Sequence, residues 1–266
     1  MAEQTMREPP ELTGEVFSAV QDKAALPLSS MIVLGILAGV YVGLGGIFAI
    51  IALAGAETMP FGVGQVLAGL VFSLGLALVL IAGAELFTGN TLMAGPLAAG
   101  RISPMTTLRA WTVVYFANFA GSLLLAVLVL LAGMHEAGDG AVGRAAVDIG
   151  ETKTGNGFAA TLASGVLANM LVCLAVWMAY AGHTVVEKVA GLTLPIAAFV
   201  AAGFEHSVAN MYLLPYAFMV QGVTSGAGTI SVGGIVGNLV PTTIGNIIGG
   251  ALVALAYWQV YVRRED

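Results

Sequence analysis

Two long apolar runs, each interrupted by a short polar segment, constrain the fold of this chain most strongly. The first covers residues 61–99 and contains GAELFTGNT at 83–91, and the second covers residues 189–220 and contains GFEHSVANM at 203–211. Each run is longer than the roughly 20–25 residues with which one straight helix crosses a bilayer. We therefore predict two membrane-spanning helices that are each broken at the polar segment.

The composition indicates an all-α integral membrane protein. The chain is 58% hydrophobic and 9% charged, with a mean hydropathy of +0.94, whereas a soluble domain carries roughly 25% charged residues. The apolar stretches are continuous and not alternating, which favours helices over a β-barrel. The single cysteine, Cys173, lies in an apolar run, so neither a disulfide framework nor a cysteine metal site is predicted. We expect no metal, no cofactor and no nucleic-acid partner.

Six spans are predicted in one transmembrane domain at residues 28–262. An N-terminal segment, residues 1–27, precedes the domain; it is too polar for a cleaved signal peptide. Residues 12–25 of that segment place Val16, Phe17, Val20 and Ala24 on one face of a surface helix. The C-terminal tail is residues 263–266. The predicted spans are about 28–54, 61–99, 109–133, 158–181, 189–220 and 232–259, with polar loops at 134–157 and 221–231.

The distribution of basic residues predicts the orientation. Seven of the nine lysines and arginines lie on the side of the two termini, and only Arg144 and Lys153 lie on the other. Cytoplasmic segments carry the excess of Lys and Arg. We therefore expect both termini in the cytoplasm and the protein in the inner (cytoplasmic) membrane.

The chain contains an internal repeat of three spans. Because an odd number of spans forms each unit, the second unit is inverted in the membrane, and paired breaks in inverted halves indicate a transport site. The three matches are Gly83-x-Glu85-x4-Asn90 with Gly203-x-Glu205-x4-Asn210, Asn118-x2-Gly121 with Asn246-x2-Gly249, and Leu37-Ala38-x3-Val42-x-Leu44 with Leu167-Ala168-x3-Val172-x-Leu174.

A broken helix exposes backbone N–H groups with the positive end of a helix dipole behind them, which favours an anion. We expect Glu85 and Glu205, with Asn90 and Asn210, to be structural at the breaks. Each carboxylate would accept hydrogen bonds from the start of the second half-helix and hold the break open. The alternative for the whole polar cluster is that it only fastens helices together.

Other side chains near the breaks are candidates for a permeation pathway. His206 is the only histidine outside the predicted loops, and an imidazole can donate a hydrogen bond to an anion or exchange a proton with it. Thr88 and Asn169 either line the pathway or hydrogen-bond neighbouring helices. Phe72 and Phe199 precede the two breaks and either form a hydrophobic constriction or make ordinary packing contacts.

Several segments resemble the formate/nitrite transporter family, and its bacterial formate channels in particular. The similarity begins near residue 16 and continues to the C-terminus, with divergence in the loops 134–157 and 221–231. The segments are TMPFG (58–62), FSLGL (72–76), ELFT (85–88), LANMLVCLAVWM (167–178), GFEHSVANM (203–211) and PTTIGNIIGG (241–250).

The resemblance implies a homopentamer of aquaporin-like protomers, each with its own pore for formate, nitrite, hydrosulfide, acetate or lactate. By position, His206 is the central pore histidine, with Thr88 and Asn169 beside it on the substrate pathway. Lys153 matches the outer entrance and Lys23 the inner one. The matching constriction positions are Phe72, Leu76, Leu86, Phe87, Val172 and Phe199.

The resulting hypothesis is a channel or transporter for small monovalent anions, with formate as the expected anion. The two lysines would concentrate anions at the entrances, and the anion would then either take a proton from His206 or only accept a hydrogen bond from it. A neutral-solute pore is the alternative, but the Asn-Pro-Ala breaks typical of water and glycerol pores are absent from the sequence. An enzyme using Glu205 and His206 lacks a second histidine or aspartate in any span.

Overall fold

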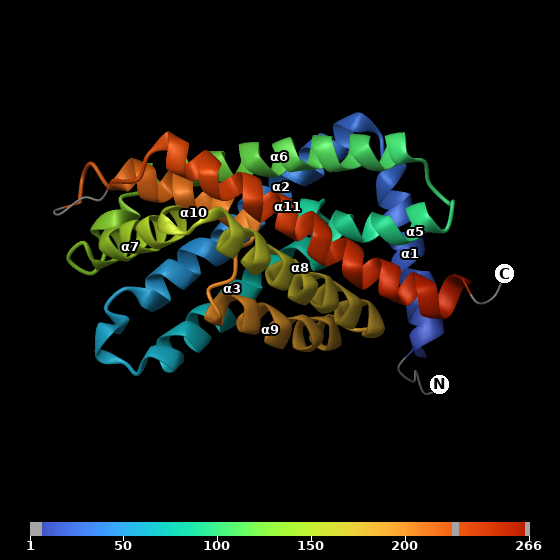
Figure 1. Cartoon of the computed structure of the whole chain (residues 1–266). Helices are drawn as coiled ribbons and strands as arrows, with labels where there is room; N and C mark the ends of the chain where they lie inside the picture. Colours follow the sequence, from blue (N-terminus) through green and yellow to red (C-terminus); the bar gives the residue numbers. More distant parts are fainter. Residues whose placement is uncertain (1–6, 225–228, 264–266) are drawn as a thin grey trace.

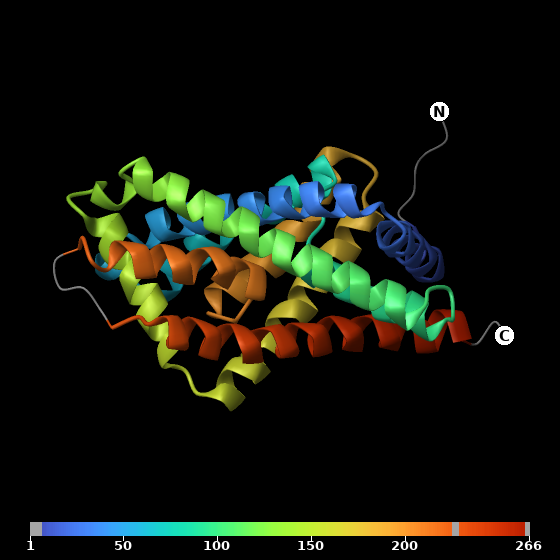
Figure 2. The same ribbon diagram turned by 90° about the horizontal axis from the view of Figure 1, so that it is seen from above.

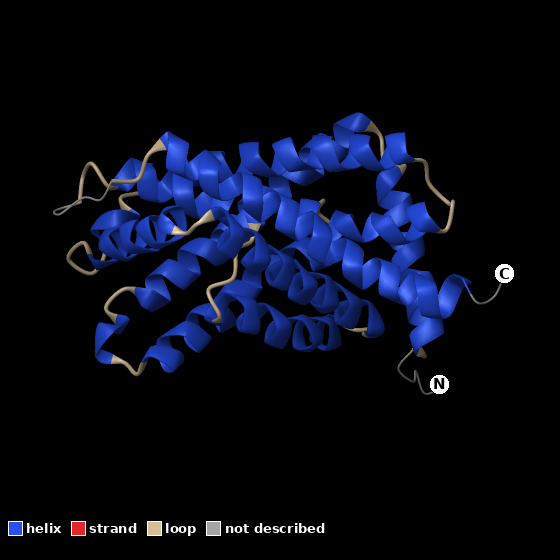
Figure 3. Ribbon diagram, in the orientation of Figure 1, coloured by secondary structure: helices blue, strands red, loops and turns tan. Residues whose placement is uncertain are grey.

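The structure, a computed structural model, describes residues 7–224 and 229–263 (Figure 1). Within these residues all regular secondary structure is helical (Figure 3). The predicted tail lies outside the described residues except for Arg263, and the predicted loop 221–231 is described except for residues 225–228.

Among the described residues, five helices are long and apolar enough to cross a membrane, and two half-helices make the sixth crossing. The half-helices are α9 (Val185–Ala201) and α10 (Ser207–Val220), joined at the second predicted break. The five are α2 (Leu28–Leu53), α3 (Phe61–Ala82), α6 (Pro104–Leu131), α8 (Phe158–Ala181) and α11 (Val232–Tyr257), which continues into a π-helical turn, η4 (Trp258–Val262).

The first predicted break is also present. α3 ends at Ala82, and the chain resumes as α4 (Phe87–Asn90), η2 (Thr91–Met93) and α5 (Ala94–Ala98). Gly83 and Gly203 adopt φ of +76° and +69°, a left-handed conformation that glycine reaches without steric cost and that commonly ends helices. The six crossings and both breaks are therefore confirmed.

Short helices lie at both ends of the bundle. α1 (Pro9–Ala24) lies across the end at which both chain termini are found, and α7 (Ala141–Gly155) lies at the opposite end (Figures 1 and 2). The predicted face of α1 is confirmed, because Val16, Phe17, Val20 and Ala24 are all buried. The remaining short helices are η1 (Ala56–Thr58) and η3 (Met134–Glu136).

Three predictions about the helices were wrong. The fifth span begins at Val185 and not near residue 189, because Thr184 caps it by accepting a hydrogen bond from the Glu187 N–H. The segment 134–157 is not a loop, because α7 occupies most of it and buries Val142, Ala146 and Val147 on one face. Its glycines obscured that helical pattern. The third span begins at Pro104 and not near residue 109, because Ser103 caps it by accepting a hydrogen bond from the Thr106 N–H.

The two halves pack in the same way. α2 packs against α3 and α6, as α8 packs against α9 and α11. A Cβ on Gly121 would lie 2.0 Å from the Ile36 carbonyl oxygen, and a Cβ on Gly249 would lie 2.2 Å from that of Val166. These paired glycines allow the backbones of two spans to meet closely, as small residues do in membrane helix pairs.

Candidate functional site

The first break is held by Asn118 of α6. Its Oδ1 accepts a hydrogen bond from the Phe87 N–H at 2.9 Å. Its Nδ2 donates to the backbone oxygens of Glu85 and Gly35, each at 2.8 Å. One amide thereby satisfies backbone groups on both sides of the break, which a buried interruption in a helix would otherwise leave unpaired.

The second break is held in the same way by Asn246 of α11. Its Oδ1 accepts from the Ser207 N–H at 2.8 Å, and its Nδ2 donates to the backbone oxygens of Glu205 at 2.9 Å and Gly165 at 2.8 Å. The Asn-x2-Gly pair found in the sequence therefore has a physical meaning. The asparagine fastens the break, and the glycine three residues later brings its helix close enough for this contact.

Glu85 pairs with a lysine and with an amide. Its Oε1 lies 2.7 Å from the Nζ of Lys23 on α1, and its Oε2 accepts from Asn90 Nδ2 at 2.9 Å. The glutamate side chain is 2% exposed. A buried carboxylate requires such partners, and here they come from α1 and from the half-helix that follows the break.

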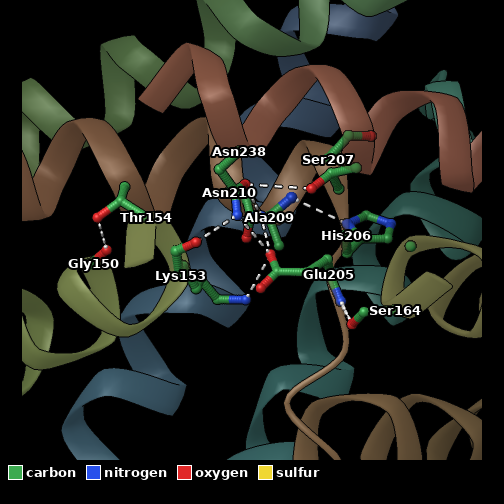
Figure 4. A network of polar contacts seen from close by, with 12 residues as sticks. Gly150, Lys153, Thr154, Ser164, Glu205, His206, Ser207, Ala209, Asn210 and Asn238 are labelled. Carbon is green, nitrogen blue, oxygen red and sulfur yellow. Dashed lines mark hydrogen bonds and ion pairs between the residues drawn. The ribbon is translucent and has the colours of Figure 1, made fainter. Parts of the chain in front are cut away.

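Glu205 repeats this arrangement (Figure 4). Its Oε2 lies 3.1 Å from the Nζ of Lys153 on α7 and also accepts from Asn210 Nδ2. Asn238 of α11 adds a contact at 3.2 Å to the same oxygen and donates to the Lys153 carbonyl at 2.9 Å. Sequence reasoning missed Asn238, since nothing in its neighbourhood distinguishes it from other asparagines of the spans.

The lysines extend the repeat beyond the spans. Lys23 lies near the end of α1 and Lys153 near the end of α7, and each helix directly precedes the first span of its half. Each lysine forms an ion pair with a buried glutamate, so the two opposite charges largely cancel in their effect on a more distant anion. The expectation that these lysines alone concentrate anions at the entrances does not follow from this geometry.

His206 and Thr88 bring the two breaks into contact. Thr88 Oγ1 lies 2.9 Å from His206 Nε2, and His206 Nδ1 accepts from the Ala209 N–H at 3.0 Å. With Nδ1 acting as an acceptor, a neutral ring carries its proton on Nε2. That N–H donates to the threonine oxygen, which leaves the threonine hydroxyl hydrogen free to donate elsewhere.

The central site is not symmetric. His206 immediately precedes α10, and the residue that immediately precedes α4 is Leu86. One break therefore presents an imidazole where the other presents an isobutyl group. Both residues are buried, at 3% and 4% exposure.

A large cavity opens on the α7 side of this site. It has a volume of about 570 Å³, and its lining includes Phe72, Phe199, Lys153, Glu205 and His206. The rings of Phe72 and Phe199 meet edge to face at 5.6 Å, and Phe199 lies 5.6 Å from the His206 ring. The predicted aromatic pair therefore lies next to the histidine.

A much smaller cavity, of about 20 Å³, lies on the α1 side. Lys23, Leu76 and Leu86 contribute to its lining, and it shares no lining residue with the large cavity. Apolar side chains therefore separate the α1 side from the central site in this structure.

Four predicted pathway residues line neither cavity: Thr88, Asn169, Phe87 and Val172. Phe87 packs against Tyr115 with a centroid distance of 4.9 Å, and Val172 is 1% exposed. Asn169 Nδ2 donates to Thr91 Oγ1 at 2.9 Å and to the backbone oxygens of Thr88 at 3.2 Å and Asn246 at 2.6 Å. These bonds tie α8 to both halves, which is the interhelical role considered for it.

Two inverted halves with paired broken spans define a class of membrane proteins, the channels and transporters built from inverted repeats. Within that class the chain belongs to the formate/nitrite transporter family, because the family model described as "Formate/nitrite transporter" matches residues 10–259. The predicted family membership is thereby confirmed.

Individual relatives agree with this assignment. The formate channel FocA of Escherichia coli K12 is 40% identical over 247 residues, covering 88% of this chain and 87% of the relative. A probable formate transporter of Methanothermobacter thermautotrophicus is 37% identical over 275 residues, covering 96% and 97%. A solved structure described as a pentameric formate channel with formate bound superposes with a TM-score of 0.83 at 38% identity, covering 89% of this chain and 98% of that one.

Proposed function

We propose that this protein is a formate channel that conducts small monovalent anions through a pore in each protomer of a homopentamer. Relatives described as formate channels, similar over nearly the whole chain, support formate as the anion. Nitrite and hydrosulfide are the alternatives within the family. The excess of basic residues at the end with both termini supports an inner-membrane protein with cytoplasmic termini.

The Thr88–His206 contact between the two mirrored breaks carries this proposal. An anion that has passed Phe72 and Phe199 reaches His206, which lines the cavity. By displacing Thr88 Oγ1 from the Nε2–H it gains two donors on facing elements, the imidazole N–H and the Thr88 hydroxyl. Hydrogen bonds to a charged group are worth about 1.5–3 kcal/mol. They offset part of the cost of bringing an anion into an apolar constriction.

The geometry favours hydrogen bonding over proton donation at His206. A neutral imidazole cannot give up its Nε2 proton without becoming an anion, so proton transfer to formate requires a ring protonated on both nitrogens. Nδ1 already accepts the Ala209 N–H, and protonating it would set two N–H groups against each other. Formate therefore passes as an anion held by donors, and any protonated ring first has to break the bond to Ala209.

The remaining predicted residues act around this centre. Leu76 and Leu86 form the apolar barrier on the α1 side. Glu85 and Glu205, held by their lysines and asparagines, keep the two breaks open. Asn169 fixes the Thr88 backbone, so that Thr88 Oγ1 stays within hydrogen-bonding distance of the imidazole Nε2–H.

Flux measurements in proteoliposomes test the function. Purified protein is reconstituted, and uptake of formate, nitrite, hydrosulfide and glycerol is followed at pH 5 and pH 7.5 against protein-free vesicles. We expect rapid formate uptake and no glycerol uptake. Glycerol uptake without formate uptake would establish the neutral-solute pore instead, and nitrite or hydrosulfide uptake far above formate uptake would reassign the anion.

A further inference from the structure

The large cavity on the α7 side carries more negative than positive charge at its mouth. Its charged lining residues outside the Lys153–Glu205 pair are Glu57 of η1 and Asp148 and Arg144 of α7. Since that pair is neutral, two carboxylates face one guanidinium, and the cavity has a net charge of about −1. A net negative mouth is unexpected on a pathway for anions.

The same cavity reaches the central site. Glu205 and His206 line its inner part, and Glu205 Oε1 is buried with no hydrogen-bond partner among the described residues. Charge at the mouth therefore acts on ions that are moving toward His206.

Asp148 is the carboxylate of this mouth whose pKa is shifted upward. Partial burial raises its pKa, the carboxylates of Glu151 and Glu57 raise it further, and Arg144 lowers it. α7 packs against η3, α10, α2 and α11, of which η3 carries His135 and Glu136, while the described residues of the other three carry no Asp, Glu, Lys, Arg or His. The carboxylates, basic side chains and histidines around Asp148 are thus Glu57, His135, Glu136, Asp139, Arg144, Glu151, Lys153, Glu205 and His206. The tyrosines on the helices packed against α7 are Tyr41, Tyr212, Tyr216 and Tyr257.

We propose that Asp148 and Glu57 form a charge filter at the mouth of the large cavity, which limits anion entry from the α7 side at neutral pH and admits anions more readily when that side is acidified. The filter rests on the proposed anion conduction. With both carboxylates ionised, the concentration of anions in the cavity is lowered. Protonation of Asp148 brings the net charge of the cavity lining to zero. Conduction at neutral pH is then easier for anions that enter from the α1 side.

The expected size of the effect follows from Coulomb's law. One unit charge at about 8 Å in water changes the local concentration of a monovalent anion by about twofold. The Debye length is about 30 Å at 0.01 M salt and about 3 Å at 1 M. The filter therefore acts at low ionic strength and disappears at high ionic strength.

Current rectification in a planar bilayer tests this proposal. Channels inserted in one orientation are bathed in symmetric 20 mM sodium formate at pH 7.5. The ratio of the current with anions entering from the α7 side to the current at the opposite voltage is then measured. The variants are Asp148→Asn, Glu57→Gln and Arg144→Gln, with Glu136→Gln, a nearby carboxylate outside the cavity lining, as the matched control.

We expect the ratio to lie below one for the unmodified protein and to rise about twofold in Asp148→Asn and Glu57→Gln. In Arg144→Gln it falls about twofold, and in Glu136→Gln, outside the lining, it changes by less than in any of the other three variants. Acidifying the α7 side to pH 4.5 raises the ratio of the unmodified protein, and this rise is smaller in Asp148→Asn. In 1 M formate all five ratios converge.

The outcomes separate the filter from the function. An absence of formate current in the unmodified protein would contradict the proposed function itself. Normal formate current with the same ratio in Asp148→Asn, Glu57→Gln and Arg144→Gln as in the unmodified protein, at 20 mM formate, would overturn the charge filter alone.

Discussion

Replacing Asn246 by alanine tests the role assigned to the paired asparagines. The change removes three hydrogen bonds and leaves the Ser207 N–H and the backbone oxygens of Glu205 and Gly165 without their partner. Hydrogen bonds between membrane helices average about 0.6 kcal/mol, which gives a lower bound of about 2 kcal/mol for the three. Unsatisfied buried groups cost about 1–3 kcal/mol each, so the loss for three groups is about 3–9 kcal/mol if relaxation is limited.

The assay is thermal unfolding of the purified protein in detergent, followed by the temperature at which the oligomer disappears from size-exclusion chromatography. A loss of 2 kcal/mol corresponds to a decrease of about 4–8 °C for a domain of this size. Asn246→Asp keeps the acceptor for Ser207 and loses both donated bonds, so its midpoint is also lowered. Asn118→Ala, the inverted counterpart, decreases the midpoint by a similar amount.

Asn156→Ala is the matched control, because Asn156 is exposed at the end of α7. Its midpoint stays within about 1 °C of the unmodified protein. If Asn246→Ala also melted within 1 °C and conducted formate at the normal rate, the second break would not depend on this amide. The parallel drawn between the two halves would then be wrong.

Three further changes test the packing, the ion pairs and the constriction. Gly121→Val places side-chain atoms against the Ile36 carbonyl and prevents assembly, seen as loss of the folded oligomer by chromatography; normal assembly would refute the close approach. Lys153→Met leaves the carboxylate of Glu205 buried without its cation, which costs about 3–5 kcal/mol. Adding Glu205→Gln removes the unpaired charge and restores most of the lost thermal-unfolding midpoint. If the double variant did not recover, the lysine would stabilise the protein independently of Glu205. Phe199→Ala opens the edge-to-face pair and raises lactate uptake relative to formate at least severalfold; an unchanged ratio would place the constriction elsewhere.

The breaks and spans were predictable because the bilayer imposes a length and an apolar composition on each crossing. Glu85 and Glu205 are conspicuous in uncharged sequence, and the left-handed glycines before them, Gly83 and Gly203, directly follow the ends of the preceding half-spans. α7 was not predicted as a helix, because several glycines and charged residues hide its short apolar face.

The ion pairs at the breaks were harder to predict. Lys23 and Lys153 are separated by 130 residues, as are Gly35 and Gly165, and this shared offset was the available signal that the repeat includes α1 and α7. A lysine before a span is ordinarily explained by membrane orientation, so its pairing with a glutamate in the break became clear only from the structure. Asn238 has no counterpart in the first half, where the same offset that relates Asn118 to Asn246 leads to Ala110.

The most direct test of the central claim is formate flux through His206→Phe in proteoliposomes between pH 5 and pH 7.5, with His183→Phe as the control for the same substitution in a connecting segment. Loss of a hydrogen bond to a charged group worth about 1.5–3 kcal/mol lowers the flux by about tenfold or more. We expect that decrease for His206→Phe at every pH tested, and normal flux for His183→Phe. Unchanged flux in His206→Phe would contradict a hydrogen-bonding role for the imidazole.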